Sequence, residues 1–259
     1  MTKQYYELQG KLITDEDRYL HSPNNVANFL QYRRIEKSVE LVIKNLKKLS
    51  RDQIIWLDVG CGDGIILREV MKRLKNNIRV KLLGLDIAKS KLQRLKHNCP
   101  QVDVIVGDAL NIPFKNNSLS IVTCFELIEH FEKEEGIRIL REIHRVLLPR
   151  GILILSTPSY YSPREYLARK SGNLGEHKYI YKQRELVTIL RSIGFEVLNV
   201  TSSGFMIPIV IFGLGWKLTE ILLNIAGSKP LIIAEKIINK IKGLKNLNWT
   251  TFIICKAIK

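Results

Sequence analysis

Cysteine is scarce in this chain, and long apolar runs are missing from it. The four cysteines, Cys61, Cys99, Cys124 and Cys255, are far apart and form no C-x-x-C pair. We therefore expect neither a disulfide framework nor a cysteine zinc site, and a reducing environment is the default. No stretch of about 18 uninterrupted apolar residues occurs, which predicts no membrane span. The opening MTKQYYELQG lacks the apolar segment of a signal peptide, so we expect a cytoplasmic protein.

Acidic residues are few relative to basic ones. The chain has 41 Lys and Arg against 25 Asp and Glu, which gives a net charge of +16 over 259 residues. This charge favours anionic partners such as nucleic acid, anionic lipid or acidic small molecules, and a solvated basic surface is the alternative. The hydrophobic content of 46% allows a sizeable core. The length fits one large domain, or one domain with an appendage.

The sequence does contain a regular alternation of short apolar runs and amphipathic segments. Apolar runs predict strands at 54–59, 80–86, 102–106, 119–125, 152–156, 195–201 and 250–256. Apolar residues spaced by three and four predict helices at 33–49, 63–75, 88–97, 133–148 and 182–193. This alternation predicts an α/β fold with a seven-stranded, doubly wound, mostly parallel sheet and helices on both faces. Such sheets bind ligands outside the carboxyl ends of their strands.

Three glycines alternate in the segment LDVGCGDGII, directly after the first predicted strand. Gly60, Gly62 and Gly64 allow a tight turn and let a ligand approach the backbone closely. A dinucleotide site would place a third glycine at position 65, which is isoleucine, and Asp63 lies where a pyrophosphate needs neutral donors. No Lys-Ser/Thr pair follows, as a P-loop requires. The segment therefore disfavours NAD and nucleoside triphosphates.

A ligand that carries a cation suits Asp58, which lies just before these glycines. The segment resembles motif I of the class I S-adenosylmethionine-dependent methyltransferases. Later segments resemble the family's other motifs in the same order: LLGLD, VIVGDALNIPF, CFELIEHF and REIHRVLLPRGILILSTPS. The resemblance covers roughly residues 50–202. It implies the Rossmann-like methyltransferase fold, S-adenosylmethionine (SAM) as cofactor and S-adenosylhomocysteine as product.

The resemblance also implies a set of cofactor-binding residues. In that family an acidic residue after the second strand holds the ribose hydroxyls, and another after the third strand reaches the adenine amino group. These roles fall to Asp86 and Asp108, although Asp86 as a helix cap and Asp108 as a turn former are the alternatives. Arg33 or Arg34 would pair with the cofactor carboxylate, or belong to a solvated basic face. The implied set is Asp58, Gly60, Cys61, Gly62, Asp86, Ile87, Asp108, Ala109 and Phe125.

Two histidines are the candidates for proton transfer. A hydroxyl or ammonium acceptor must lose a proton, and histidine titrates in a suitable range. His130 lies in the ELIEH segment, and His177 follows the fifth strand, where this family usually builds its acceptor pocket. The alternatives are surface residues for Glu129 and His130 and a plain loop residue for His177. No cluster at metal-ligand spacing is visible along the sequence, so we expect no metal.

About 47 residues separate the last two predicted strands, which exceeds the usual connection length. They begin with the apolar GFMIPIVIFGLGW and continue with an amphipathic helix at 231–245, which has a lysine border. Such a helix is typical of a membrane interface, here through residues 205–245, while an active-site flap and a homodimer contact are alternatives. Its apolar face combines Ile233, Ala234, Ile237, Ile238 and Ile241. The predicted organisation is an N-terminal cap and helix (1–50), the methyltransferase core (51–202), the insert (203–247) and the last core strand (248–259).

These features predict an enzyme that methylates a small-molecule or lipid-linked acceptor at oxygen, carbon or nitrogen. An RNA methyltransferase that uses the basic surface is one alternative. The tetrapeptide of the N-P-P-Y type, which base-amino methylases carry after strand four, is absent, since residues 125–128 read FELI. A non-catalytic cofactor-binding protein is the other alternative.

Overall fold

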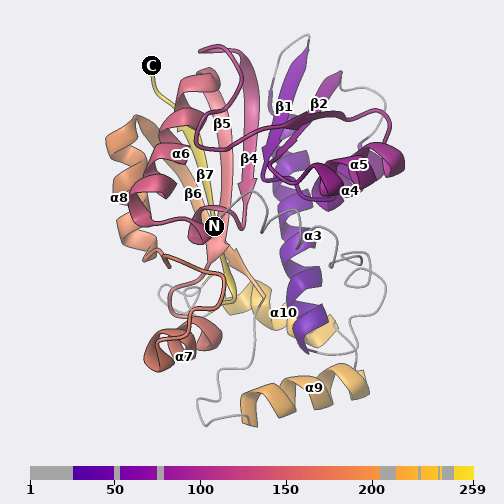
Figure 1. The fold of residues 1–259 in the computed structure, drawn as a ribbon. Helices are drawn as coiled ribbons and strands as arrows, with labels where there is room; N and C mark the ends of the chain where they lie inside the picture. The colour runs from indigo at the N-terminus through magenta and orange to yellow at the C-terminus, as the bar shows by residue number, and fades with distance from the viewer. Residues whose placement is uncertain are drawn as a thin grey trace.

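A single seven-stranded sheet forms the centre of the molecule (Figure 1). The computed structural model describes residues 26–49, 53–74, 79–204, 214–226, 229–238, 240 and 248–259. The strands are β1 (Ile54–Val59), β2 (Val80–Asp86), β3 (Asp103–Val106), β4 (Leu119–Phe125), β5 (Leu147–Pro158), β6 (Phe195–Ser203) and β7 (Thr250–Ala257). Their order is β3-β2-β1-β4-β5-β7-β6, and only β7 runs antiparallel to its neighbours. The predicted mostly parallel sheet is confirmed.

Helices cover both faces of this sheet (Figure 1). Because side chains alternate along a strand, Trp56 and Ile121 belong to one buried cluster while Leu57 and Val122 belong to the other. The first cluster is closed by α3 (Val26–Leu46), α4 (Ile65–Arg73) and α5 (Lys89–Asn98), and the second by α6 (Lys133–Val146) and α8 (Gln183–Ile193). The predicted two-sided arrangement is therefore confirmed.

Two elements differ from the sequence prediction in their extent. β5 starts at Leu147 instead of residue 152, because Leu147 already pairs with Leu119 of β4. α3 starts at Val26 instead of residue 33. Its first turns pack Val26 and Phe29 against the insert helices, a long-range contact that periodicity does not reveal.

The insert contributes two described helices, α9 (Leu214–Ala226) and α10 (Lys229–Ile238). The sequence predicted a helix at 231–245 and none at α9. α10 faces the molecule through Leu231 and Glu235, whereas the expected apolar face is turned outward, with Ile233 and Ile237 59% and 56% exposed. The predicted residues 241–245 and most of the apolar start of the insert lie outside the described residues, as do residues 1–25. Among the described helices, none is long and apolar enough to cross a membrane.

A short helix, α7 (Pro163–Ser171), was also absent from the prediction. Ser162 caps it by accepting a hydrogen bond from the Glu165 N–H at 3.3 Å, and Pro163 occupies its first turn. Gly172 ends it in a left-handed conformation. This Ser-Pro-x-Glu start and glycine stop are recognisable helix signals that the sequence analysis passed over.

Candidate active site

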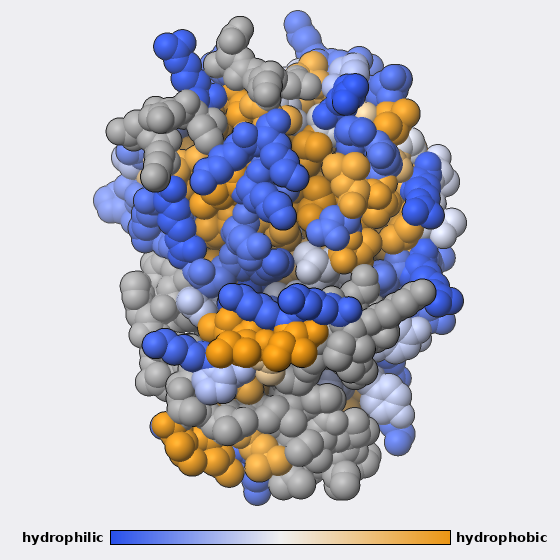
Figure 2. Space-filling model, turned by 180° about the vertical axis from the view of Figure 1, so that it is seen from behind, coloured by the Kyte–Doolittle hydropathy of each residue, from blue (hydrophilic) through white to orange (hydrophobic). Residues whose placement is uncertain are grey.

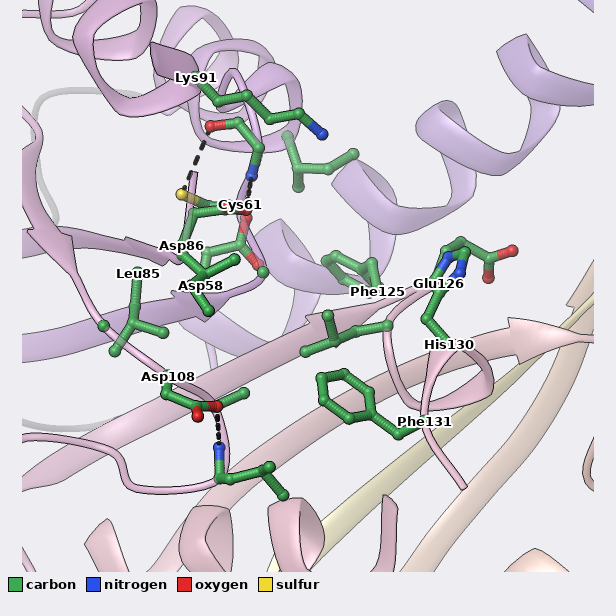
Figure 3. Close-up of a pocket in the computed structure, with 18 of the residues that line it drawn as sticks. Asp58, Cys61, Leu85, Asp86, Lys91, Asp108, Phe125, Glu126, His130 and Phe131 are labelled. Atoms are coloured by element: carbon green, nitrogen blue, oxygen red, sulfur yellow. Dashed lines mark hydrogen bonds between the residues drawn. The ribbon is translucent and has the colours of Figure 1, made fainter. Parts of the chain in front are cut away.

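A cavity of about 510 Å³ opens at the carboxyl ends of β1, β2 and β4, where parallel sheets bind ligands. All nine residues predicted to bind the cofactor line it, and so does His130. Figure 3 shows Asp86 and Asp108 on one side and Glu126 and His130 on the other, with the Phe125 and Phe131 rings between them. His177 does not line the cavity but lies behind His130, and the two ring centres are 5.3 Å apart.

The glycine loop combines tight packing with an open backbone. Gly60, Gly62 and Gly64 have φ angles of 72°, 54° and 73°, in the left-handed region that favours glycine. A Cβ atom on Gly64 would lie 2.3 Å from Leu95 Cδ1, so this glycine lets α4 begin directly against α5. A Cβ on Gly62 would meet only the Lys91 side chain, at 3.9 Å. The loop therefore presents its backbone to the cavity at Gly62.

Asp86 is held rigidly at the end of β2. Its Oδ2 accepts a hydrogen bond from the Gly62 N–H at 2.9 Å, and its Oδ1 accepts one from the Ala88 N–H at 2.8 Å. The second bond forms a tight turn just before α5, whose N-cap is Ala88 without a side-chain cap, so Asp86 lines the cavity and does not cap the helix. Each carboxylate oxygen keeps a further lone pair for a hydroxyl donor.

Asp58 is oriented by a chain of hydrogen bonds inside the sheet. The Trp56 Nε1–H donates to Thr123 Oγ1 at 2.8 Å, and the Thr123 hydroxyl donates to Asp58 Oδ1 at 2.5 Å. Asp58 is only 3% exposed. Burial, and then the negative charge of Asp58, raise the pKa of the neighbouring Cys61 thiol well above its usual value. A buried carboxylate at this position favours a cationic ligand group.

Asp108 forms the turn that the sequence left open as an alternative. Its Oδ1 accepts from the Leu110 N–H at 2.9 Å, and its carbonyl oxygen accepts from the Asn111 N–H at 3.0 Å. The side chain is exposed at the cavity. Asp63, in contrast, does not line the cavity, because Arg94 of α5 holds its carboxylate through two 3.1 Å hydrogen bonds.

Of the two candidate arginines, Arg34 reaches the cavity. Its Nη1 lies 3.9 Å from Glu126 Oε2, and the Ser156 hydroxyl donates to Glu126 Oε1 at 2.7 Å. Glu126 has a φ of 47°, a conformation that costs a non-glycine residue about 1 kcal/mol or more and that clusters at functional sites. Arg33 is instead paired with Glu235 of α10. The sequence does not show which of these two adjacent arginines faces the cavity.

Glu129, His130 and His177 converge beside the cavity. The Lys178 and Tyr179 N–H groups donate to the Glu129 carbonyl oxygen at 2.7 and 3.2 Å, which anchors the loop at 172–182 against the short 3₁₀ helix η1 (Ile128–His130). Glu129 is fully buried, so the surface interpretation was wrong for it. Burial and then Glu126 raise its pKa well above the usual value, and burial and then His177 lower the pKa of His130.

The sign of charge inside the cavity opposes that of the whole chain. Seven carboxylates line it against three Lys or Arg side chains, although the chain carries a net charge of +16. The three cations are Arg34, Lys91 and Lys178, and the carboxylates are Asp58, Asp86, Asp108, Glu126, Glu132, Glu135 and Glu176. This field favours a ligand with positive charge over a phosphate-rich one.

Comparison with known proteins identifies the family. Residues 57–155 match a family model described as a methyltransferase domain. A Mycolicibacterium smegmatis protein, named as a probable S-adenosylmethionine-dependent methyltransferase, is 28% identical over 146 residues, which cover 54% of this chain and 51% of the relative. Residues 57–155 are a methyltransferase domain of the class I S-adenosylmethionine-dependent type. The predicted family is thus confirmed, and membership implies SAM as the cofactor of this methyltransferase.

Other similar proteins are more distant or match over a shorter range. A mouse protein named as a probable tRNA methyltransferase is 34% identical over 99 residues, which cover 38% of this methyltransferase and 20% of the relative. A chain from the complex between the Haloferax volcanii Trm112 methyltransferase activator and a methyltransferase superimposes with a TM-score of 0.61. It is 16% identical, and the match covers 99% of this chain and 96% of that one, a likeness that shows the fold. The chain spans about half the length of the first curated relative.

Proposed function

We propose that this methyltransferase binds SAM in the cavity at the strand ends and transfers its methyl group to a small-molecule or lipid-linked acceptor. The observation that carries the proposal is the excess of carboxylates around an open glycine backbone. SAM supplies a methyl group on a positively charged sulfonium, and it also carries an ammonium group. Such a ligand suits an acidic cavity better than a dinucleotide would.

Each part of SAM would contact cavity residues whose chemistry matches it. Asp86 would accept hydrogen bonds from two vicinal hydroxyls, since backbone donors already fix both of its oxygens. Asp108 would accept from the adenine amino group. Asp58 and the Gly62 backbone would lie beside the methionine portion of SAM. Arg34 would offer its guanidinium to the SAM carboxylate. His130 is the histidine placed to take a proton from an acceptor.

Exposed apolar side chains at one end of the molecule support a lipid-linked acceptor. Seven of the ten large hydrophobic residues that are exposed in the described part of the chain lie on or beside α7, α9 and α10: Tyr161, Tyr166, Leu167, Ile221, Ile225, Ile233 and Ile237. Figure 2 shows orange side chains in the lower half, where α9 and α10 lie, and a further orange area in the upper half of the same face. Exposed lysines accompany them at 217, 229, 236 and 240. Apolar helix faces bordered by lysine favour an anionic membrane surface.

The experiment is a transfer assay with methyl-labelled SAM and a lysate of the source cells. After extraction with organic solvent, we expect the label in the organic phase, and none there with the Asp86→Ala variant. If the label stays in the aqueous phase and vanishes on ribonuclease treatment, the acceptor is RNA. If SAM binds but no label moves with any fraction, the protein is a non-catalytic binder.

An RNA acceptor is the second candidate, because of the net charge of +16 and the relatives named as tRNA methyltransferases. Phosphate binding would use the outer surface, since the cavity itself is acidic. Affinity for RNA would then fall steeply as salt is raised. A weak, salt-independent interaction would count against this candidate.

A further inference from the structure

Three side chains from two distant segments of the sequence offer metal ligands at one wall of the cavity. Glu129 and His130 come from η1, after β4, and His177 comes from the loop at 172–182. One ligand atom of each lies within 4.8 Å of the others. Ligand atoms bound to zinc at about 2.0–2.1 Å in a tetrahedral site are roughly 3.4 Å apart. Small side-chain rotations would therefore bring these atoms to bonding distance.

Both imidazoles are already oriented by a partner on their other nitrogen. His130 Nδ1 lies 3.2 Å from the Glu176 carbonyl oxygen, and His177 Nδ1 lies 3.4 Å from Glu165 Oε2. Glu165 is itself 1% exposed. An Nδ1–H that donates to such an acceptor leaves Nε2 as the lone pair, which is how metal-binding histidines are held. His130, whose ring lines the cavity, would place the ion at the cavity wall.

The carboxylate of Glu129 supplies an independent sign of a missing ligand. Its Oε2 accepts from the Thr157 hydroxyl at 3.2 Å, but its Oε1 has no hydrogen-bond partner among the described residues. The residue is fully buried. A buried carboxylate oxygen without a partner is costly, and a bound cation would satisfy it.

We propose that Glu129, His130 and His177 bind one divalent transition-metal ion of the zinc type. Two imidazole nitrogens and one carboxylate oxygen suit Zn²⁺ and its first-row neighbours better than Mg²⁺ or Ca²⁺, which prefer all-oxygen sites. Three protein ligands leave a coordination position open, as in catalytic sites. This set is not visible as a spacing along the sequence, which predicted no metal, because His177 lies 47 residues after His130.

The consequence for chemistry rests on the proposed function. An acceptor hydroxyl bound at the open position would have a lowered pKa. Its O–H bond would break and the proton would pass to solvent, because His130 would use its free lone pair as a metal ligand and could no longer accept the proton. The electron pair would remain on the oxygen, which would bond to the methyl carbon of SAM as the sulfur–methyl bond breaks. The site therefore favours an oxygen-directed methyltransferase.

The test is a direct measurement of metal binding to the full chain, without SAM or acceptor. The protein is freed of metal with a chelator and titrated with Zn²⁺ by calorimetry, and with Co²⁺ by visible absorption. We expect one ion per chain with micromolar or tighter affinity, and a loss of at least about 100-fold with His177→Gln or Glu129→Gln. Glu165→Gln should cost about 10–100-fold by releasing the His177 ring. The matched control is His97→Gln, an exposed histidine on α5 that should bind as wild type.

Several results would overturn the proposal: no stoichiometric Zn²⁺ uptake, a featureless Co²⁺ spectrum, or equal affinity in wild type and His177→Gln. SAM affinity and circular dichroism report whether each variant folds. If Glu129→Gln does not fold, the Zn²⁺ affinity of His130→Gln, a variant at the cavity wall, tests the proposal in its place. Because metal binding and methyl transfer are measured separately, a metal-free methyltransferase refutes only this inference, and a metal-binding protein without transfer refutes only the proposed function.

Discussion

The two sides of the cavity are built in different ways. On the cofactor side, the ends of β1, β2 and β3 each place one aspartate at the same sheet edge. Backbone N–H groups hold Asp86 and Asp108, and Thr123 holds Asp58. On the proposed acceptor side, the loop at 172–182 bonds to η1 about 50 residues earlier and, through His177 and Glu165, to α7 12 residues earlier.

The two sides also differ in how tightly their glycines are packed. In the glycine loop, an added Cβ would lie 2.3 Å from Leu95 of α5 at Gly64 and 2.8 Å from Leu127 at Gly60, so these two positions tolerate little change. The loop at 172–182 contains Gly172 and Gly175, whose φ angles are also positive, but an added Cβ on either would meet nothing within 4 Å. On the proposed assignment, a tightly packed half would recognise the fixed cofactor, and a less constrained half would vary with the acceptor. The following predictions test this contrast.

The largest effect is expected at Asp86. Replacing it by alanine removes charge-assisted hydrogen bonds to two hydroxyls, each worth about 1.5–3 kcal/mol. We expect SAM affinity to fall by at least about 100-fold in calorimetry, while the fold persists. Asp103→Ala, at the opposite end of β3 and 57% exposed, is the matched control and should bind normally. Equal SAM affinity in the two variants would show that Asp86 does not bind the cofactor.

The glycine contrast predicts unequal destabilisation by the same substitution. Gly64→Ala adds a Cβ 2.3 Å from Leu95 Cδ1 at a φ of 73°, and Leu95 is fully buried. Backbone strain and overpacking should together cost about 2–4 kcal/mol in denaturant unfolding. Gly172→Ala has nearly the same φ, 69°, with open space, so only about 1 kcal/mol of strain is expected. Similar losses in the two variants would contradict the contrast in packing.

A buried ion pair links α10 of the insert to α3, in addition to their apolar contacts. Arg33 of α3 donates to both Glu235 oxygens of α10 at 3.0 Å, with side chains 13% and 3% exposed. Arg33→Met should lower the unfolding free energy by about 2–3 kcal/mol, because the buried carboxylate loses its bidentate partner. The double variant Arg33→Met with Glu235→Met should recover most of this loss. Additive losses would show that the pair is not coupled.

The cofactor side could be predicted well because its chemistry follows from local sequence. Asp58 lies near the end of β1, Asp86 ends β2 and Asp108 follows β3, and the ends of parallel strands meet at one edge of a sheet. The resemblance to the methyltransferase motifs pointed to all three, and all three line the cavity. The three glycines predicted a tight turn, and all three have the left-handed backbone that such a turn can use. Strands β1, β2 and β4 have the predicted bounds for the same reason, since buried strands are continuous apolar runs.

The acceptor side could be predicted only in part because its geometry depends on long-range contacts. No local pattern shows that Glu129 is fully buried, or that Glu165 lies behind His177. The long α3 depends on insert residues such as Leu223 and Leu231, about 190 to 200 residues away. The apolar face of α10 was found correctly as a pattern, but its direction is set by Leu231 and Glu235, which contact the rest of the protein.

The smallest effect is expected at that outward face, and it tests whether the acceptor side ends at a membrane. Ile225 is 80% exposed and Ile233 is 59% exposed. Burying one isoleucine contributes about 1.5–3 kcal/mol when complete, so Ile225→Asp or Ile233→Asp should each lower partitioning into anionic vesicles about tenfold. Leu198→Asp, at a 46% exposed position of β6, should leave partitioning unchanged.

If all three variants bind vesicles as wild type but Ile225→Asp converts a dimer to a monomer in sedimentation, the face is a subunit contact. SAM affinity should stay constant throughout, because none of these residues lines the cavity.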